Sequence, residues 1–424
     1  MNFPAIIALS VFVLSYAVII SEKLHKTIIA LVGAAVLVLF GVLSQEEAIG
    51  FIDFNTIGLL AGMMIIVSVI KQTGLFEYLA IRQAKKAKGN PVKIMISFLI
   101  ITAILSAFLD NVTTIIVIVP VTLNICRLIG VNPIPFVICE IFASNIGGTA
   151  TLIGDPPNIL IGSATQLSFS DFIWNLAPIS IICILVSIFA FKLIFKKDLQ
   201  KADSIEKLME MDEKNAIVDS ALLIKSLIVT SLVILGFFLH GALHIGTASI
   251  ALAGAAILLT IAKVDVEEAF DGVEWTTIFF FVGLFILVGG LEKTGILKYL
   301  AKLTFESTGG NILLTGLAIL WVSAILSAFI DNIPFVATMI PMIRTFGELS
   351  GAGNIDFLWW CLALGACFGG NGTIIGASAN VIGVDALKNS GYSISFKEFF
   401  KIAFPVMILT MVIATIYARI VLYH

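Results

Sequence analysis

Three aspartates interrupt otherwise apolar stretches of this sequence. Asp110, Asp155 and Asp331 each lie within a run of hydrophobic and small residues. An ionised aspartate at the centre of a bilayer costs about 2.5–3.5 kcal/mol, so three of them facing lipid would cost on the order of 8–10 kcal/mol. They must therefore face water, a cation or a proton. Carboxylates that share a proton titrate as a coupled set, which suits proton exchange.

Amide and hydroxyl side chains surround these aspartates and could supply neutral oxygens to a cation. They occur where apolar helices are broken, and no lysine or arginine lies in these breaks. A di- or tricarboxylate would meet like charge there, so a cation or a neutral solute fits better, although helix N-termini would offset part of the repulsion. No cofactor is predicted beyond a bound sodium ion or proton, with the three aspartates as sodium ligands. The candidate binding residues are Asp110, Asn111, Thr113, Thr114, Asn145, Thr149, Thr151, Asp155, Asn158, Asp331, Asn332, Asn371, Thr373, Ser378 and Asn380.

The composition requires a lipid environment. Of the 424 residues, 59% are hydrophobic and 12% are charged, whereas a soluble domain carries about 25% charged residues. A net charge of -3 argues against a nucleic-acid partner. The five cysteines lie in apolar runs without CxxC spacing, which predicts small buried side chains and no metal site. The predicted partners are the lipid bilayer and a small ion or solute.

The sequence contains an internal repeat at an offset of 221 residues. From residue 46 to 120, 25 of 75 positions are identical to those 221 further on, among them Asp110-Asn111 and Asp331-Asn332. With one inserted residue the match resumes, so that Gly148, Thr151, Gly154 and Asn158 align with Gly370, Thr373, Gly376 and Asn380. Such long self-similarity determines the architecture before any other feature does.

The two copies are predicted to face opposite sides of the membrane. Residues 82–93 hold five basic residues and no acid, whereas the matching 303–314 hold one acid and no basic residue. Basic loops stay on the cytoplasmic side. We therefore expect a multi-pass protein of the cell membrane with an N-terminal repeat at 1–195, a charged cytoplasmic linker at 196–221 and a C-terminal repeat at 222–424. Both termini would lie outside.

The predicted fold class is an all-α integral membrane protein of two inverted repeats, each with five transmembrane segments, a re-entrant hairpin and an interrupted helix. The hairpins are 94–127 and 312–345, with tips at Asp110 and Asp331 and arms of about 15–17 residues, short for spanning. The expected crossings are 4–20, 27–43, 55–71, 135–165 and 173–195 in the first copy, and 222–240, 247–263, 276–290, 356–388 and 398–420 in the second. Inverted repeats of this kind are typical of secondary transporters.

The fourth crossing of each copy is broken by glycines and polar residues. Residues 143–158 include Pro156 and Pro157, and residues 369–380 repeat the pattern without prolines or aspartate. Lipid cannot satisfy the backbone groups freed by such a break, so the break must line a cavity enclosed by protein. Polar breaks at matching places in two inverted copies predict a central binding site.

Three segments carry a family resemblance. Residues 106–114, 145–158 and 369–380 resemble the ion transporter superfamily, and most of all its branch with the melanosomal P protein, the ArsB arsenite pumps and the NhaD sodium/proton antiporters, permeases with a citrate-transporter-like domain. The resemblance spans nearly the whole chain. It implies paired re-entrant hairpins, a central site, elevator movement and a homodimer. Related dicarboxylate carriers have Ser-Asn-Thr at the hairpin tips, where this sequence has Asp110-Asn111-Val112-Thr113 and Asp331-Asn332-Ile333-Pro334.

These observations predict a secondary active transporter, with sodium/proton antiport as the specific expectation and arsenite or antimonite efflux as the alternative. An organic anion (citrate or dicarboxylate) transporter and an ion channel stay open as further alternatives. An enzyme is not expected. No P-loop is present for an ATP-driven pump, and the GxGD signature of an intramembrane aspartyl protease is absent, because Leu152 and Ile153 precede Gly154.

Overall fold

The computed structural model describes residues 3–21, 23–199, 206–351 and 354–423, and this part of the chain is helical without strands. The first repeat contains α1 (Phe3–Ile20), α2 (Lys26–Leu39), α3 (Gln45–Gly50), α4 (Phe54–Gln72), α5 (Leu75–Lys86), α6 (Pro91–Phe108), α7 (Asn111–Ile129), α8 (Ile134–Thr149), α9 (Pro156–Ala164) and α10 (Phe169–Ile194). The linker carries α11 (Glu206–Glu210) and η1 (Glu213–Ala216). The second repeat contains α12 (Ser220–Leu243), α13 (Thr247–Ala262), α14 (Val266–Asp271), α15 (Trp275–Lys293), α16 (Ile296–Thr308), α17 (Ile312–Phe329), α18 (Asn332–Ser350), α19 (Asp356–Gly369), η2 (Gly370–Gly372), η3 (Ile374–Gly376), α20 (Ser378–Asn389), α21 (Phe396–Tyr417) and η4 (Ala418–Leu422).

The helix boundaries repeat with the sequence. Helices α4, α6 and α7 begin at residues 54, 91 and 111, and their counterparts α15, α17 and α18 begin at 275, 312 and 332, each 221 residues later. The turns that follow α4 and α15 use Gly74 and Gly295, with φ of 76° and 78°. Glycine adopts this left-handed conformation without the penalty that a Cβ imposes, so both copies make the same turn.

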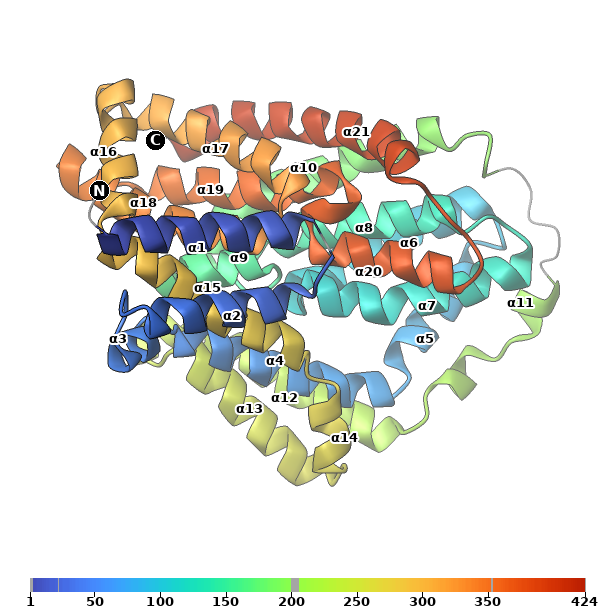
Figure 1. The fold of residues 1–424 in the computed structure, drawn as a ribbon. Helices are drawn as coiled ribbons and strands as arrows, with labels where there is room; N and C mark the ends of the chain where they lie inside the picture. Colours follow the sequence, from blue (N-terminus) through green and yellow to red (C-terminus); the bar gives the residue numbers. More distant parts are fainter. Residues whose placement is uncertain (1–2, 22, 200–205, 352–353, 424) are drawn as a thin grey trace.

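Helices from the two copies pack against one another and form a scaffold. Helix α4 packs on α13, and α15 packs on α2, so each pair joins one helix from each repeat (Figure 1). Matched glycines make both contacts: a Cβ on Gly62 would lie 2.7 Å from the Ala251 carbonyl carbon, and a Cβ on Gly283 would lie 2.6 Å from that of Ala30. Small residues let helix backbones approach in this way in membranes.

Gly62→Leu is expected to separate α4 from α13. A leucine would collide with the Ala251 backbone, which cannot move aside as a flexible side chain could, and overpacking of this kind costs about 1–3 kcal/mol or more. We expect a lower melting temperature and less monodisperse protein on size exclusion. The control is Gly241→Leu on α12, where an added Cβ meets nothing within 4 Å. Equal melting temperatures for the two variants would contradict this packing.

A second group of helices forms the body that carries the hairpins, whereas α1 and α12 pack on the scaffold. The α6–α7 hairpin packs on α8 of its own copy, the α17–α18 hairpin packs on α19, and α10 and α21 pack beside them. The two hairpins lie toward opposite ends of the molecule, as do the connecting helices α5 and α16 (Figure 1). Both chain ends lie at the α16 end, and α11 of the linker lies at the α5 end (Figure 1). This arrangement is the one expected of inverted copies.

The linker is fastened to α5 outside the apolar helices. Lys85 Nζ lies 2.7 Å from Glu213 Oε2 and donates to the Met211 carbonyl oxygen, also at 2.7 Å. The hydrogen bond and charge of Lys85 lower the pKa of the Glu213 carboxyl below its ordinary value. This contact is therefore present at neutral pH and is lost only as acid protonates Glu213.

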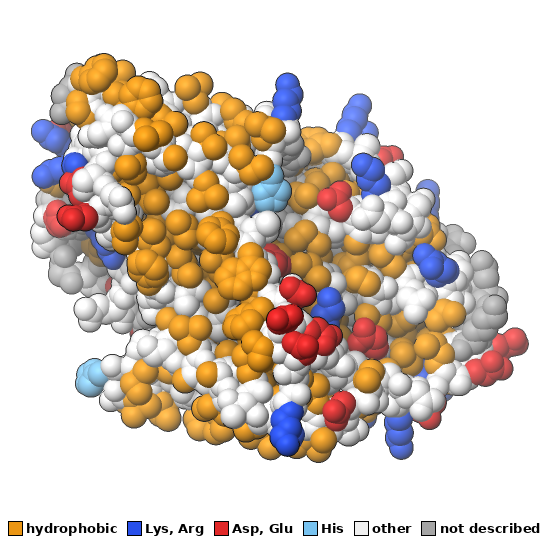
Figure 2. Space-filling view, turned by 60° about the horizontal axis from the view of Figure 1, so that its bottom comes forward, with side chains coloured by type: hydrophobic (Ala, Val, Ile, Leu, Met, Phe, Trp, Pro, Cys, Tyr) orange, Lys and Arg blue, Asp and Glu red, His pale blue; other side chains and the backbone are white. Residues whose placement is uncertain are grey.

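Nine helices of the described part are long and apolar enough to cross a membrane: α1, α4, α6, α7, α10, α12, α15, α17 and α21 with its extension to Leu422. Hydrophobic side chains cover broad areas of the face drawn in Figure 2. Each expected crossing contains a helix, although α2 and α13 have only 14 and 16 residues. The arms of the hairpins have 18 and 19 residues, so the expected length of 15–17 was wrong and arm length alone does not identify a re-entrant hairpin.

Candidate functional site

The hairpin tips place two of the three aspartates at helix N-termini. Asp110 caps α7, where its Oδ1 accepts from the Thr113 N–H at 2.8 Å and its Oδ2 accepts from Thr113 Oγ1 at 2.5 Å. Asp331 caps α18 by accepting from the Ile333 N–H at 3.1 Å. An aspartate at this position satisfies a free backbone donor and faces the positive end of the helix dipole. Thr113 is thus a partner of Asp110.

Matched hydrogen bonds hold each interrupted helix against its hairpin. Ser106 Oγ donates to the Ser144 carbonyl oxygen and Ser327 Oγ to that of Ala366, both at 2.6 Å. Thr151 and Thr373 likewise donate to the carbonyl oxygens of Ala107 and Ala328 in the hairpin arms. The hydroxyl groups of Thr151 and Thr373, two of the predicted ligands, therefore donate their protons to structural hydrogen bonds.

In each broken segment, one asparagine side chain bridges two backbone carbonyl oxygens. Asn158 Nδ2 donates to the carbonyl oxygens of Thr149 and Thr151, at 2.9 and 2.8 Å. Its counterpart Asn380 donates to those of Gly370 and Thr373, at 2.7 and 2.8 Å. Backbone groups that the break frees from helix bonds are thereby satisfied without lipid or water.

An amide network joins the two copies at the centre. Asn145 Oδ1 accepts from Asn111 Nδ2 at 3.0 Å, and Asn145 Nδ2 donates to Asn371 Oδ1 at 3.0 Å and to Asn380 Oδ1 at 2.9 Å. Asn111 Nδ2 also donates to Asp155 Oδ1 at 3.2 Å. All five residues are buried. Asp155, Asn111 and Asn145 of the first copy and Asn371 and Asn380 of the second therefore form one site.

Five buried atoms of the predicted binding residues lack a hydrogen-bond partner in the described part of the protein. They are Asp155 Oδ2, Asn111 Oδ1, Asn332 Nδ2, Asn371 Nδ2 and Thr114 Oγ1. Leaving a buried polar atom unpaired costs about 1–3 kcal/mol, and native structures contain few such atoms. The unpaired oxygens Asp155 Oδ2 and Asn111 Oδ1 are acceptors that suit a proton or a cation.

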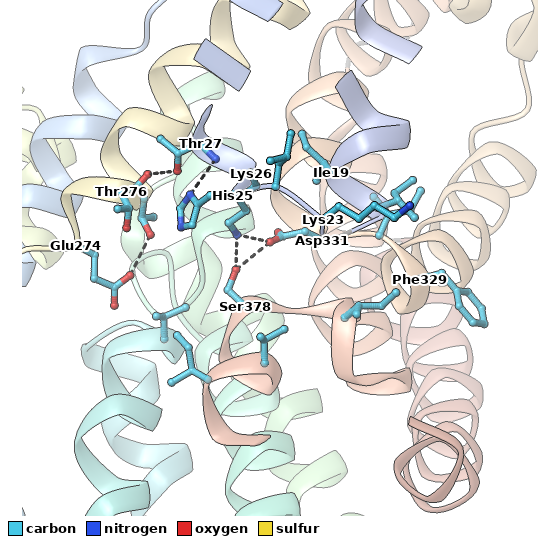
Figure 3. A pocket seen from close by; sticks show the side chains of 18 residues that line it. Ile19, Lys23, His25, Lys26, Thr27, Glu274, Thr276, Phe329, Asp331 and Ser378 are labelled. Atoms are coloured by element: carbon cyan, nitrogen blue, oxygen red, sulfur yellow. Dashed lines mark hydrogen bonds and ion pairs between the residues drawn. The ribbon is translucent and has the colours of Figure 1, made fainter. Parts of the chain in front are cut away.

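A separate polar group forms around Asp331. Lys26 Nζ lies 2.6 Å from Asp331 Oδ2 and 2.6 Å from Ser378 Oγ, and Ser378 Oγ donates to Asp331 Oδ2 at 2.9 Å. Figure 3 shows the three side chains pointing toward one another in a cavity of about 520 Å³. The cavity lies between the start of α2 and α15 on the scaffold and the second hairpin with α20 on the other body.

The ion pair corrects one inference from the sequence. No basic residue lies within the broken segments, but Lys26 reaches Asp331 from α2, 305 positions away in the chain. The argument that the aspartates have no cationic partner was therefore wrong for Asp331. In addition, no group of three His, Cys, Asp or Glu side chains in the described residues is placed to hold a metal ion, so the three aspartates do not form a single three-carboxylate site.

Four polar residues that contact the hairpins or line the cavity were not predicted from the sequence. Lys26 lies outside the broken segments from which the binding residues were predicted. Tyr16 donates to the Pro334 carbonyl oxygen at 2.9 Å and so touches the second hairpin from α1. Glu274 lines the cavity, and Glu140 is fully buried in α8 with Oε1 2.5 Å from Thr122 Oγ1. An acid inside an expected crossing is itself a signal of function, and Glu140 could have been found by it.

The chain is similar to known proteins in family, in sequence and in fold. A family model described as "Citrate transporter" matches residues 16–365. An uncharacterized transporter of Mycobacterium tuberculosis (strain ATCC 25618 / H37Rv) is 44% identical over 97% of this chain and 97% of its own length. The P protein of Homo sapiens is 32% identical over 95% of this chain, which covers 58% of the P protein.

A solved structure shares the overall fold. The YdaH transporter of Alcanivorax borkumensis, described as having an unusual topology, aligns with a TM-score of 0.66 over 100% of this chain and 98% of that chain. The two sequences are 13% identical, so the likeness concerns the fold alone. The predicted fold class, an all-helical membrane protein of two repeats, is confirmed.

Proposed function

This chain belongs to the citrate transporter family, and from that premise we propose that it is a secondary active transporter that exchanges sodium ions for protons at Asp155. The observation that carries the proposal is the pair of buried, unpartnered acceptors Asp155 Oδ2 and Asn111 Oδ1. An ionised carboxylate cannot remain uncompensated in such a place, because the cost of burying the charge alone is several kcal/mol. A proton or a sodium ion neutralises it, and the two cannot bind at once.

Competition for one carboxylate supplies the coupling. When sodium binds, Asp155 releases its proton, and when sodium leaves, the carboxyl group is protonated again. Asp110 caps the helix whose first residue, Asn111, contacts Asp155, so a cation at the site also relieves repulsion between these two aspartates. Asn111 and Asn145 hold the carboxylate in place through the amide network.

The surrounding machinery is part of the same proposal. We take the two hairpins as re-entrant, with tips in mid-membrane, because each tip packs against the broken helix of its own copy. The resemblance to the ion transporter superfamily supports elevator-type movement in a homodimer. Basic residues in 82–93 support a cytoplasmic linker with both termini outside.

An organic anion is the second candidate substrate. The unpaired donors Asn332 Nδ2 and Asn371 Nδ2 could bind carboxylate oxygens, and Lys26 supplies a positive charge at the cavity. Citrate or a dicarboxylate would then travel with the cation. The family description supports this alternative, and the aspartates at both hairpin tips disfavour it.

The deciding experiment measures sodium and proton flux in proteoliposomes of the purified protein, because one-for-one exchange of sodium for a proton moves no net charge. Sodium, arsenite, citrate and a dicarboxylate are each applied at several pH values. The proposal predicts a response to sodium alone that depends on the pH gradient. A current or flux that needs citrate, with sodium inert by itself, would establish the second candidate, and a response to arsenite would reject both.

A further inference from the structure

The matched aspartates of the two copies differ in their ion pairing. Asp331 and Asp110 occupy the same place in the repeat and both cap a helix. Asp331 is paired with Lys26, whereas no cationic side chain of the described residues forms a salt bridge with Asp110. The residue that matches Lys26 in the second copy is Thr247. Of the two matched aspartates, only Asp331 therefore has a charged partner from the start of the second helix of a copy.

Lys26 and Asp331 belong to different bodies of the molecule. Lys26 begins α2, which packs on α15 of the scaffold, while Asp331 begins α18 of the second hairpin. The pair crosses the cavity between them, with Lys26 also 4.8 Å from the centre of the Phe280 ring. Glu274 is the other acid near this lysine. A displacement of one body past the other that exceeds the reach of the Lys26 side chain therefore breaks the contact.

The ammonium group of Lys26 has the charge of a sodium ion or a proton. While it lies 2.6 Å from Asp331 Oδ2, that carboxylate needs no exchangeable cation, and a second positive charge there would be repelled. The side chains of Lys26 and Asp331 are 26% and 11% exposed. Solvent screening at such a site is incomplete, so the competition is strong.

From this geometry we propose that Lys26 is a tethered cation that displaces an exchangeable cation from Asp331 whenever the two bodies adopt the arrangement seen here. Asp331 then binds a cation, either sodium or a proton, only when the bodies have moved apart from this arrangement. The pair thereby adds Asp331 to the coupled exchange and sets how many cations each cycle carries. The proposal rests on the proposed function, because it assumes cation exchange at the central aspartates.

The test uses the full-length protein in proteoliposomes with Lys26→Gln. The number of exchangeable cations per cycle is obtained from the membrane potential and ion gradients at which net flux reverses. We expect the variant to transport, to carry one cation fewer per cycle, and to reach half-maximal rate at a roughly tenfold lower sodium concentration, since Asp331 no longer loses its cation to the tether. Lys298→Gln, which neutralises an exposed lysine on α16, controls for charge alone.

The double variant Lys26→Gln/Asp331→Asn separates displacement from a structural role. With both charges removed, the cation count should equal that of Lys26→Gln, and the roughly tenfold gain in sodium affinity should disappear. Lys26→Arg should keep the wild-type count. An unchanged count in an active Lys26→Gln protein overturns the role of Lys26 and leaves the proposed function intact. Loss of transport in both Gln-containing variants, with intact folding on size exclusion, also overturns it. Absence of coupled flux in the wild-type protein rejects the proposed function itself.

Discussion

Asp155→Asn is expected to abolish coupled transport while the protein still folds. The amide has the shape of the carboxylate and its oxygen can still accept from Asn111 Nδ2, now 3.2 Å from Asp155 Oδ1. It cannot bind a proton in exchange for sodium, so the competition that couples the two ions is lost. Sodium-driven proton flux in proteoliposomes should fall to the level of empty vesicles at every pH tested.

The control for this substitution is Asp271→Asn, an exposed aspartate at the end of α14. It should retain wild-type flux, and both variants should elute as wild type on size exclusion. Normal pH-dependent flux in Asp155→Asn would refute the assignment of the exchanging carboxylate. A variant that leaks sodium without moving protons would still agree with it, because binding and coupling are then separated.

Asn145→Leu is expected to have the second largest effect, on stability as well as on transport. Its amide makes three hydrogen bonds that join the hairpin of the first copy to the broken helix of the second. Leucine fills a similar volume but leaves Asn371 and Asn380 oxygens without donors, at about 1–3 kcal/mol each. The melting temperature should drop by several degrees, and transport should be lost even at low temperature.

Ile146→Val, on the next buried position of α8, provides the matched control. Removing one methylene group there typically costs about 0.5–1.5 kcal/mol and should leave transport measurable. If Asn145→Leu melts and transports like Ile146→Val, the amide network does not join the copies in the way described. Restoring polarity with Asn145→Gln should recover part of the stability and little of the transport, since the longer side chain displaces Asn371.

The repeat made most of the fold predictable from the sequence. The offset of 221 residues found in the sequence is the offset between the starts of α4 and α15, α6 and α17, and α7 and α18. Hydrophobic length located the crossings, and glycine and proline located the breaks in α8–α9 and α19–α20. The confirmed membership of the citrate transporter family agrees with the resemblance read from these breaks. The packing of α4 on α13 and of α15 on α2 was not predictable, because it depends on contacts of Gly62 and Gly283 with helices of the other copy.

The candidate site was predictable in its residues and less so in its partners. Asn111, Asn145 and Asp155 could be singled out because polar side chains are rare in apolar helices. The contact of Lys26 with Asp331 spans 305 positions, and no local pattern reports such a distance. Periodicity also could not distinguish Thr151 and Thr373, whose hydroxyls hold the hairpin arms, from residues free to bind a ligand.

Proton release on sodium addition is the most direct test of the central claim, that one buried carboxylate binds either ion. Purified wild-type protein in weakly buffered detergent solution receives sodium chloride, with choline chloride as the ionic-strength control, and the pH is recorded. The account predicts acidification with sodium, none with choline, and none with sodium in Asp155→Asn. No proton release from the wild-type protein, or equal release from Asp155→Asn, would contradict it.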